Sequence, residues 1–328
     1  MWRAGVALIV FVALVAVLAP SLTPHGAHYL FPDRAYAPPM PMHVVGEDGR
    51  WRAPFVYPVR LADRLERRYE EDRANPITLS WLSGGVVVQQ ADGSRGPWLP
   101  LGGDGSGRDV FARLLYGARL SLAVALVATL GALLVGTLVG GVAGASGGLV
   151  DDVLMRFSDF VLVLPAMYVV LSLRAALPLV LPTAQVFALV AGILAAVGWP
   201  IVARGVRAIV AAERGRDYAQ AARALGMGRG RLLLRHLLPA ARGFVATQAT
   251  LLAAAFILAE ATLSFVGLGF PEPSVSWGVM LQDAANVAAI GDAPWTLAPA
   301  AAIFLVVLGV NLIVQQDPAR RAEWRPGL

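Results

Sequence analysis

The chain has 328 residues, of which 57% are hydrophobic and only 15% are charged, and its formal net charge is +5. Soluble domains carry about 25% charged residues, so this composition predicts a membrane protein. There is no cysteine, and all 27 Lys or Arg positions are arginine, which excludes disulfides, thiolate chemistry, Schiff-base catalysis and an ATP-binding P-loop.

Six apolar segments are long enough to cross a membrane, for which about 20 residues are needed. They cover residues 4–20, 120–142, 153–173, 186–202, 244–269 and 295–314. The first resembles a secretory signal, and its cleavage would leave five spans. We favour an uncleaved helix because six spans place both termini on one side. The sequence therefore predicts an all-α polytopic membrane protein.

Residues 23–110 contain no long apolar segment and differ in composition from the rest of the chain. They predict a small α/β insert outside the membrane. Segments 44–51 and 84–98 each hold a glycine-centred turn between short apolar runs, a pattern typical of a β-hairpin. A module of this size has a thin core of its own. We therefore expect it to pack on the transmembrane helices, as a docking platform or as a cover.

Two other parts of this insert are charged or rich in glycine. Residues 59–75 have a helical period and predict a helix. Its apolar stripe consists of Leu61, Leu65 and Tyr69. Segment 101–110 lacks the ligand spacing of an EF-hand, so we expect a glycine-rich lead-in. Asp109 is expected near the start of the next helix, where its charge suits the helix dipole.

Small and charged residues in the spans predict contacts between helices. Gly136, Gly140 and Gly144 recur every four residues, which lets another backbone approach closely. Arg156 and Asp159 are three residues apart, so they can pair on one helix face.

Glu260 lies deep in the fifth span. A carboxylate there is costly and normally faces protein or a water-filled path. It is therefore predicted either to contribute to the translocation path or to pack between helices.

The loop 204–242 between the fourth and fifth spans is strongly basic. Its arginines are Arg204, Arg207, Arg214, Arg216, Arg223, Arg229, Arg231, Arg235 and Arg242. Only Glu213 and Asp217 oppose them, so the positive-inside rule predicts that this loop is cytoplasmic. The tail, with Arg320, Arg321 and Arg325, is then also cytoplasmic.

The pattern of this loop predicts two helices rather than a simple connection. Asp217 suits the N-cap of the first helix, and Gly226 suits the C′ position after it. Ala219, Ala221 and Ala222 would give that helix a smooth face that a partner can approach. The loop is thus expected to dock against another protein.

The second predicted helix covers residues 231–238 and meets a stop or a kink at Pro239. His236 has no second histidine or carboxylate at a ligand spacing, so no metal site is predicted. We expect His236 to cap the end of this helix.

Four segments resemble the permease subunits of ABC importers for dipeptides, oligopeptides and nickel, in the branch with an extended first outer loop. LGGDGSGRDVFARLLYGARLSL is similar to the family pattern LGTDxxGRDVxSRxxYGxRxSL, and DYAQAARALG is similar to the EAA-loop sequence DYVEAARALG. RHLLP resembles RHxLPN, and AEATLSFVGLGFPEPSVSWGVML resembles AExxLSFLGLGxxPPxxSWGxML. The resemblance covers about residues 100–318. Departures are Gln220 for the motif's Glu, Gly103 for Thr and Ala240 for Asn.

The resemblance implies the six-helix MetI-like architecture of type I importers and a coupling role for the basic loop. The positions that match the ATPase-coupling motif are Asp217, Tyr218, Ala219, Gln220, Ala221, Ala222, Ala224, Leu225, Gly226, Arg235, His236 and Pro239. It also implies a second permease subunit, two ATPase subunits and a solute-binding protein as partners. ATP and Mg²⁺ would bind the ATPases, with no cofactor on this chain.

These expectations divide the chain into a first transmembrane helix (1–22), an extracytoplasmic insert (23–110), a permease core (111–318) that contains the coupling loop 204–242, and a cytoplasmic tail (319–328). The expected location is the bacterial inner membrane, with no nucleic-acid partner. A nickel or other small-solute permease is the alternative within the family. A membrane-embedded enzyme is disfavoured because the spans hold no catalytic constellation, and a secondary transporter because no repeat is visible.

Overall fold

The computed structural model describes residues 2–46, 49–63, 67–83, 85–90, 96–165, 168–169, 172, 181–285 and 291–314. Contacts divide the chain into two compact units. Unit 1 contains Met1–Val6, Ala123–Glu260 and Val307–Leu328, and unit 2 contains Ala7–Leu122 and Ala261–Val306. The predicted arginine-rich tail lies outside the described residues.

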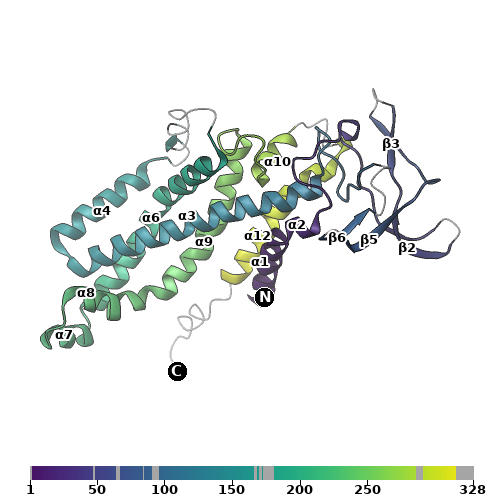
Figure 1. Ribbon diagram of the computed structural model, residues 1–328. Helices are drawn as coiled ribbons and strands as arrows, with labels where there is room; N and C mark the ends of the chain where they lie inside the picture. The colour runs from purple at the N-terminus through teal and green to yellow at the C-terminus, as the bar shows by residue number, and fades with distance from the viewer. Residues whose placement is uncertain are drawn as a thin grey trace. The chain divides into compact units, whose positions relative to one another are not determined.

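The described chain is mostly helical (Figure 1). Its longer helices are α1 (Trp2–Val17), α3 (Val110–Ser146), α4 (Gly148–Val163), α6 (Thr183–Arg214), α9 (Arg242–Phe265) and α12 (Ala298–Val314). Shorter ones are α2 (Ala19–Leu22), α7 (Asp217–Ala224), α8 (Arg229–Leu232) and α10 (Trp277–Asp283). The described chain also contains the π-helical segment η3 (Leu233–Leu237) and the 3-10 segments η1 (Pro32–Arg34), η4 (Leu238–Ala241) and η5 (Pro294–Leu297).

Within the described residues, four helical stretches are long and apolar enough to cross a membrane. They cover Val110–Ser146, Thr183–Arg214, Arg229–Phe265 and Pro294–Val314. These stretches confirm the second, fourth, fifth and sixth predicted spans. The first predicted span corresponds to α1, an apolar helix of 16 residues. The third begins in α4, and most of its second half lies outside the described residues.

The glycine stripe of α3 packs directly on α6 within unit 1, as predicted. A Cβ atom on Gly140 would lie 2.2 Å from the carbonyl oxygen of Ala203, and one on Gly144 would lie 2.7 Å from that of Arg207. A Cβ atom on Gly136 would be 2.6 Å from the carbonyl oxygen of Trp199. The carbonyl oxygens at positions 199, 203 and 207 of α6 also recur every four residues, so each glycine of α3 lies close to the α6 backbone.

Helices α4 and α6 are joined by two ion pairs. The carboxylate of Asp151 accepts hydrogen bonds from the Arg207 guanidinium, with a distance of 2.9 Å from Nε to Oδ1. Asp159 pairs with Arg204 at 3.2 Å. The predicted pair between Arg156 and Asp159 is therefore wrong, because Asp159 finds its partner on the neighbouring helix.

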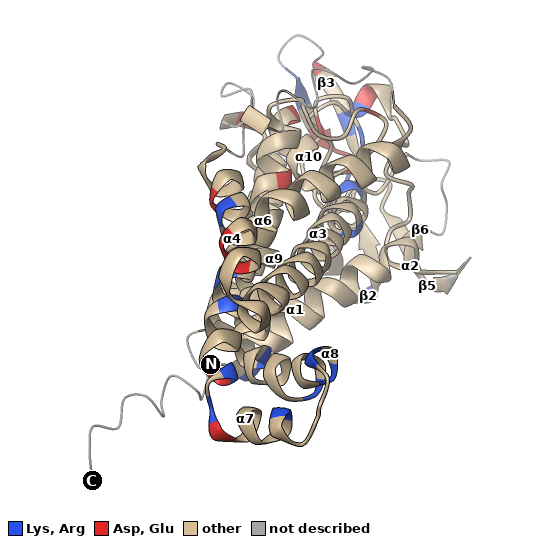
Figure 2. Ribbon diagram, turned by 90° about the vertical axis from the view of Figure 1, so that its left-hand side faces the viewer, with Lys and Arg blue, Asp and Glu red and all other residues tan. Residues whose placement is uncertain are grey.

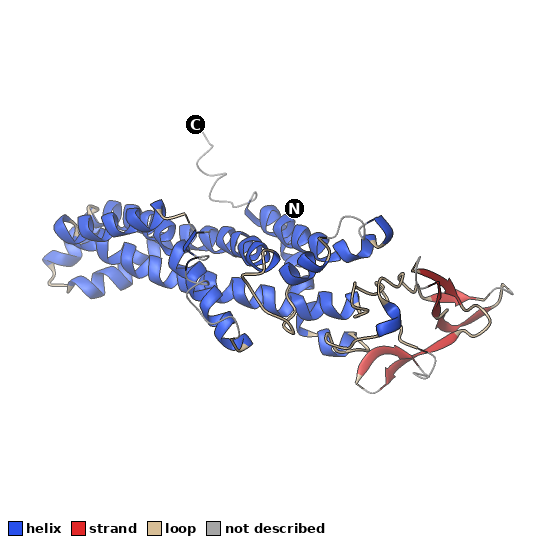
Figure 3. Cartoon of the chain, turned by 90° about the horizontal axis from the view of Figure 1, so that it is seen from above, coloured by secondary structure: helices blue, strands red, loops and turns tan. Residues whose placement is uncertain are grey.

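The strands all belong to unit 2 (red in Figure 3). The strands β1 (His43–Val45), β2 (Trp51–Val56), β5 (Ile77–Ser83) and β6 (Val86–Gln90) form an antiparallel sheet in the order β1-β2-β5-β6. The first predicted hairpin is confirmed as β1–β2. The second predicted segment contains β6, which pairs with the preceding strand β5, and most of the predicted turn after β6 lies outside the described residues.

The predicted helix over residues 59–75 is wrong. Strands β3 (Val59–Asp63) and β4 (Arg68–Glu71) form an antiparallel hairpin instead, in which Leu61 is opposite Tyr69. Leu61 and Tyr69 share a side because they are partners on the two paired strands and not because they lie on successive helical turns. Leu65 lies outside the described residues. The left-handed conformation of Arg67, with φ of 51°, helps to reverse the chain.

The insert has a hydrophobic core of its own. Its buried members are Ala37, Met40, Val56, Val59, Ile77, Leu79, Trp98 and Leu99. Phe31, Tyr69 and Val88 pack against this core. The Tyr69 hydroxyl donates a hydrogen bond of 2.7 Å to the carbonyl oxygen of Ala35, which ties the β3–β4 hairpin to the start of the insert.

Candidate functional site

The loop predicted to dock a partner is folded along its whole length. Helix α6 ends at Arg214, α7 covers Asp217–Ala224, and α8 begins at Arg229. Both short helices carry exposed basic residues (Figure 2). Only two residues separate the end of α6 from the start of α7.

The junction between α6 and α7 is held by side chains. Glu213 accepts a hydrogen bond of 2.6 Å from the Tyr218 hydroxyl and pairs with Arg216 at 3.0 Å. The hydrogen bond to Glu213 raises the pKa of the Tyr218 phenol above its usual value, with burial acting in the same direction. The Nε2 of Gln220 donates a hydrogen bond of 2.9 Å to the carbonyl oxygen of Gly215.

This role of Gln220 depends on its amide. A glutamate, which the family motif has at this position, is only an acceptor when ionised and could not donate to a carbonyl. The departure from the motif therefore creates a link between α6 and α7 that a glutamate would not form.

The N-terminus of α7 differs by one residue from the prediction. Arg216 occupies the N-cap position, and Asp217 is the first residue of the helix. Asp217 therefore acts through its charge in the first turn, where it suits the positive end of the helix dipole.

The C-terminus of α7 is a Schellman motif, and Gly226 is its C′ residue as predicted. The amide of Met227 donates to the carbonyl of Ala222 at 3.0 Å, and that of Gly226 donates to Arg223 at 2.9 Å. Gly226 has φ of 82°, a left-handed conformation in which a Cβ atom is unfavourable.

The alanines of α7 do not share one face, which corrects the prediction. Ala219 is fully buried, whereas Ala221 is exposed and Ala222 is intermediate. Ala219 and Ala222 are three residues apart on the inner side of the helix. The exposed surface instead contains Tyr218 and Leu225, which is 89% exposed.

Pro239 does not stop the second helix of the loop. The chain continues from α8 through the π-helical and 3-10 segments into α9, so Arg229–Phe265 is one helical stretch. Proline has no amide hydrogen and its ring disturbs the preceding turn. The change of helical type at this point absorbs that disturbance.

His236 lies in the π-helical segment, within the helical stretch and not at its end, so the predicted capping role is wrong. Its ring centroid is 6.4 Å from that of Tyr218. Arg235 and Pro239 are both exposed. The two matched motif segments, DYAQAARALG and RHLLP, thus approach each other at Tyr218 and His236.

Glu260 is fully buried in α9. Its carboxylate is therefore surrounded by the chain itself, which favours packing over a place in the translocation path. The choice between these two roles stays a prediction.

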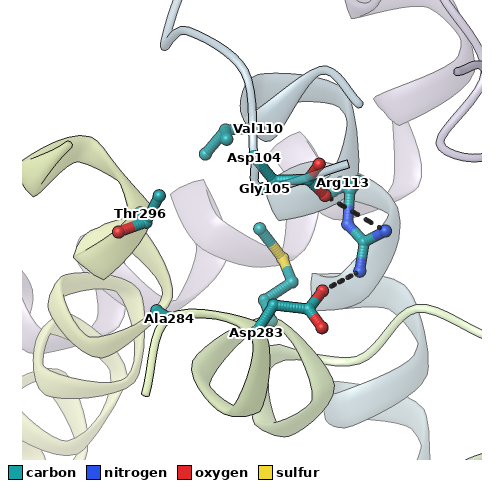
Figure 4. A pocket seen from close by; sticks show the side chains of 8 residues that line it. Asp104, Gly105, Val110, Arg113, Asp283, Ala284 and Thr296 are labelled. Atoms are coloured by element: carbon teal, nitrogen blue, oxygen red, sulfur yellow. Dashed lines mark hydrogen bonds and ion pairs between the residues drawn. The ribbon is translucent and has the colours of Figure 1, made fainter. Parts of the chain in front are cut away.

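Sequence reasoning missed a charged network in unit 2, beside the glycine-rich segment 101–110. Arg108 pairs with Asp104 at 2.7 Å, with Glu272 at 2.6 Å and with Asp283 at 3.0 Å. Arg113 pairs with Asp283 at 2.9 Å and lies 3.4 Å from Asp104 (Figure 4). These five side chains connect four segments of unit 2.

Burial and ion pairing act in opposite directions on the pKa values in this network. The Arg108 and Arg113 side chains are only 10% and 2% exposed. Burial would lower the pKa of Arg108, but the hydrogen bond to Glu272 and the charge of Asp104 raise it overall. Burial raises the pKa of the Asp283 carboxyl, against the opposing effect of Arg113 and Arg108.

The turn that presents Arg108 is built by Asp104. Its Oδ1 accepts hydrogen bonds from the amides of Ser106 and Arg108, at 2.8 and 2.9 Å. Asp109 then begins α3 by accepting from the amide of Phe111 at 2.9 Å, so its predicted place is confirmed. The spacing of Asp104 and Arg108 was the signal that could have revealed this turn.

Helix α10 is fastened to the first half of α3 by hydrogen bonds. The amide of Trp277 donates to the Ser121 hydroxyl at 3.1 Å, and the indole of Trp277 donates to the carbonyl of Leu114 at 3.0 Å. Two motifs that the sequence presents separately, 101–122 and 259–281, thus meet in one site.

Several described helices are long and apolar enough to cross a membrane, and a folded basic loop connects two of them. This arrangement defines a multi-pass membrane protein. Residues 136–316 match the family of the binding-protein-dependent transport system inner membrane component. This match contains the whole loop 204–242.

Individual relatives agree with the family match. The chain is 42% identical over 213 residues to the dipeptide transport system permease protein DppC of Alkalihalophilus pseudofirmus, over 65% of this chain and 67% of that protein. It is 34% identical over 225 residues to the oligopeptide transport system permease protein OppC of Lactococcus lactis subsp. cremoris, over 69% of this chain and 75% of that protein. For the OppC of Bacillus subtilis the identity is 35% over 213 residues, or 65% of this chain and 67% of that protein.

The chain therefore belongs to the family of binding-protein-dependent transport system inner membrane components. It is a permease subunit of an ABC importer and not an enzyme. A system of this kind includes an ATPase and a solute-binding protein.

Proposed function

We propose that this permease translocates peptides, delivered by a solute-binding protein and driven by ATP hydrolysis on separate ATPase subunits. The names of the similar dipeptide and oligopeptide permeases support this substrate class. A second permease subunit would complete the pore, and two ATPases would bind below it.

The proposed coupling element is α7 with its flanking turns. The observation that carries this proposal is that α7 is short and exposed, and that hydrogen bonds hold both its start and its end in place. Gln220 and Glu213 hold its start to α6, and the turn at Gly226 fixes its end. Closure of the ATPases would move this helix as a rigid lever, and α6 would carry the motion into the membrane.

We further propose a six-span core with both termini in the cytoplasm and the insert 23–110 outside. The arginine excess of the loop 204–242 supports this orientation. ATP and Mg²⁺ would then bind only to the partner ATPases.

Substitution at Gly226 tests the coupling role. Gly226→Val places a β-branched residue at φ of 82°, a conformation that costs an ordinary residue about 1–2 kcal/mol. We expect the complete importer, reconstituted in liposomes with its solute-binding protein, to keep hydrolysing ATP. Its uptake of a labelled dipeptide and a labelled pentapeptide should fall at least tenfold per ATP hydrolysed.

The matched control is Gly228→Val. Gly228 lies two residues further on with φ of −64°, and no atom is near its missing side chain. This variant should transport normally. Normal uptake by the Gly226→Val complex would refute the lever. Uptake of ⁵⁷Ni²⁺ but of neither peptide by the wild-type complex would refute the substrate class.

A further inference from the structure

A cavity of about 330 Å³ lies beside the coupling loop, within unit 1. The ends of α3 and α6, the end of α7 with the turn after it, and the start of the next helical stretch line it. Its lining residues are Ala145, Ser146, Arg214, Arg223, Met227, Arg229, Leu232 and Leu237. The volume is at the lower end of the range of about 300–1,000 Å³ that is typical of small-molecule sites.

The charged side chains that line this cavity are all basic. Three lining residues are arginines, and none is acidic. Within the described part of the chain, Arg223 and Arg229 form no ion pair, and Arg214 donates to the carbonyl oxygen of Ala145 at 3.3 Å. Other arginines nearby are paired, such as Arg207 with Asp151. Guanidinium groups of like charge around one cavity repel one another, although water screens Arg223 and Arg229, which are exposed. An anion between them would relieve this repulsion.

The floor of the cavity is apolar. Leu232 and Leu237 are at most 1% exposed, and Met227 is partly buried beside them. An inorganic anion gains nothing from such a surface. A molecule with a charged head and an apolar part would use both halves of the lining.

The position of the cavity along the helices suggests the source of such a molecule. Ala145 and Ser146 are the last residues of α3, a stretch with the length and composition of a membrane span. The end of a span lies at the level of lipid headgroups, where basic pockets between helices bind anionic lipids.

We propose that this cavity binds a phosphate group, supplied by the headgroup of an anionic phospholipid. The guanidinium groups of Arg214, Arg223 and Arg229 would hold the phosphate oxygens, for which the planar fork of arginine is well suited. The bound headgroup would link the end of α3 to the coupling loop. This inference requires the loop to lie at a membrane surface, and it depends on neither the peptide substrate nor the ATPase contact.

Thermal unfolding of the purified full-length subunit in a neutral detergent tests the proposal. Phosphatidylglycerol should raise the Tm of the wild-type chain in a saturable way, whereas phosphatidylcholine should not. The variant Arg223→Gln/Arg229→Gln should need at least fivefold more phosphatidylglycerol for half of the shift. The control Arg231→Gln/Arg242→Gln removes the same charge from exposed residues outside the cavity and should respond like the wild type.

Three results would overturn the proposal. Equal loss of the response in both double variants would mean that phosphatidylglycerol binding depends only on the net charge of the protein. A full response to inorganic phosphate, with nothing added by the lipid, would mean that soluble phosphate is the ligand. An unchanged lipid response together with weaker ATPase binding by Arg223→Gln/Arg229→Gln would mean that the cavity receives a carboxylate of the partner protein.

Discussion

At the scale of single residues, Gln220 shows how one side chain links two helices. Gln220→Glu would restore the motif residue but replace the donor to Gly215 with a second acceptor. We expect the α6–α7 junction to loosen by about 0.5–1.5 kcal/mol, the net contribution of one hydrogen bond. Hydrogen exchange of residues 217–226 should then be faster than in the wild type. Gln220→Ala should behave similarly, and unchanged exchange in both variants would contradict the bracing role.

Tyr69 gives the insert a pH dependence at high pH. Burial raises the pKa of its phenol, although Arg34 and Arg67 act in the opposite direction. The folded chain then keeps this proton where the unfolded chain releases it, at an ordinary value of about 10. Stability should therefore fall as the pH rises from about 10 through the raised pKa.

This effect is measurable because few other side chains titrate in the same pH range. The chain has no lysine or cysteine and only 7 tyrosines. The fall in Tm between pH 9.5 and 11.5 should be smaller in Tyr69→Phe than in the wild type. Tyr29→Phe, at a tyrosine that is 64% exposed, serves as the control. An identical pH profile for all three proteins would contradict a raised pKa of the partly buried Tyr69 phenol.

At the scale of helices, the α3–α6 contact depends on the absence of side chains along one stripe. Gly140→Leu would place a branched side chain where even a Cβ atom lies 2.2 Å from the Ala203 carbonyl. The helices must separate, and overpacking of this kind costs about 1–3 kcal/mol or more. The thermal stability of the detergent-solubilised chain should drop clearly.

A second glycine provides the comparison for Gly140. Gly192 lies in α6 with no atom within 4 Å of its missing Cβ. Gly192→Leu should keep or slightly raise the Tm, because leucine is the better helix former. If both leucine variants unfold at the wild-type temperature, the glycine stripe does not hold the helices together.

Structural elements could be predicted from the sequence where the spacing of residues was compatible with only one kind of secondary structure. The stripe at Gly136, Gly140 and Gly144 and the C′ glycine at 226 were found because each has a single physical interpretation. The predicted helical stripe at Leu61 and Tyr69 was wrong because two residues eight apart can also face each other across a hairpin, as they do here. The predicted partner of Asp159 was also wrong. A carboxylate at a helix surface has neighbours on two helices, and the sequence shows only those on its own helix.

At the scale of the whole molecule, the charged network shows why some of the site was not visible in the sequence. Asp104 and Arg108 belong to one motif, whereas Glu272 and Asp283 lie more than 160 residues further along. Nothing in either segment specifies the other as its partner. The fold brings them together, and it leaves Arg113 buried between two carboxylates.

The orientation of the molecule can be tested because the native chain has no cysteine. Each single-cysteine variant therefore reports one site without background. Ala221→Cys marks the exposed face of α7, and Trp51→Cys marks strand β2 of the insert, where the side chain is 81% exposed. A membrane-impermeant maleimide added to spheroplasts should label Trp51→Cys fully and Ala221→Cys only after lysis. Labelling of Ala221→Cys in sealed cells would place the coupling loop outside, and an ATPase could not reach it there.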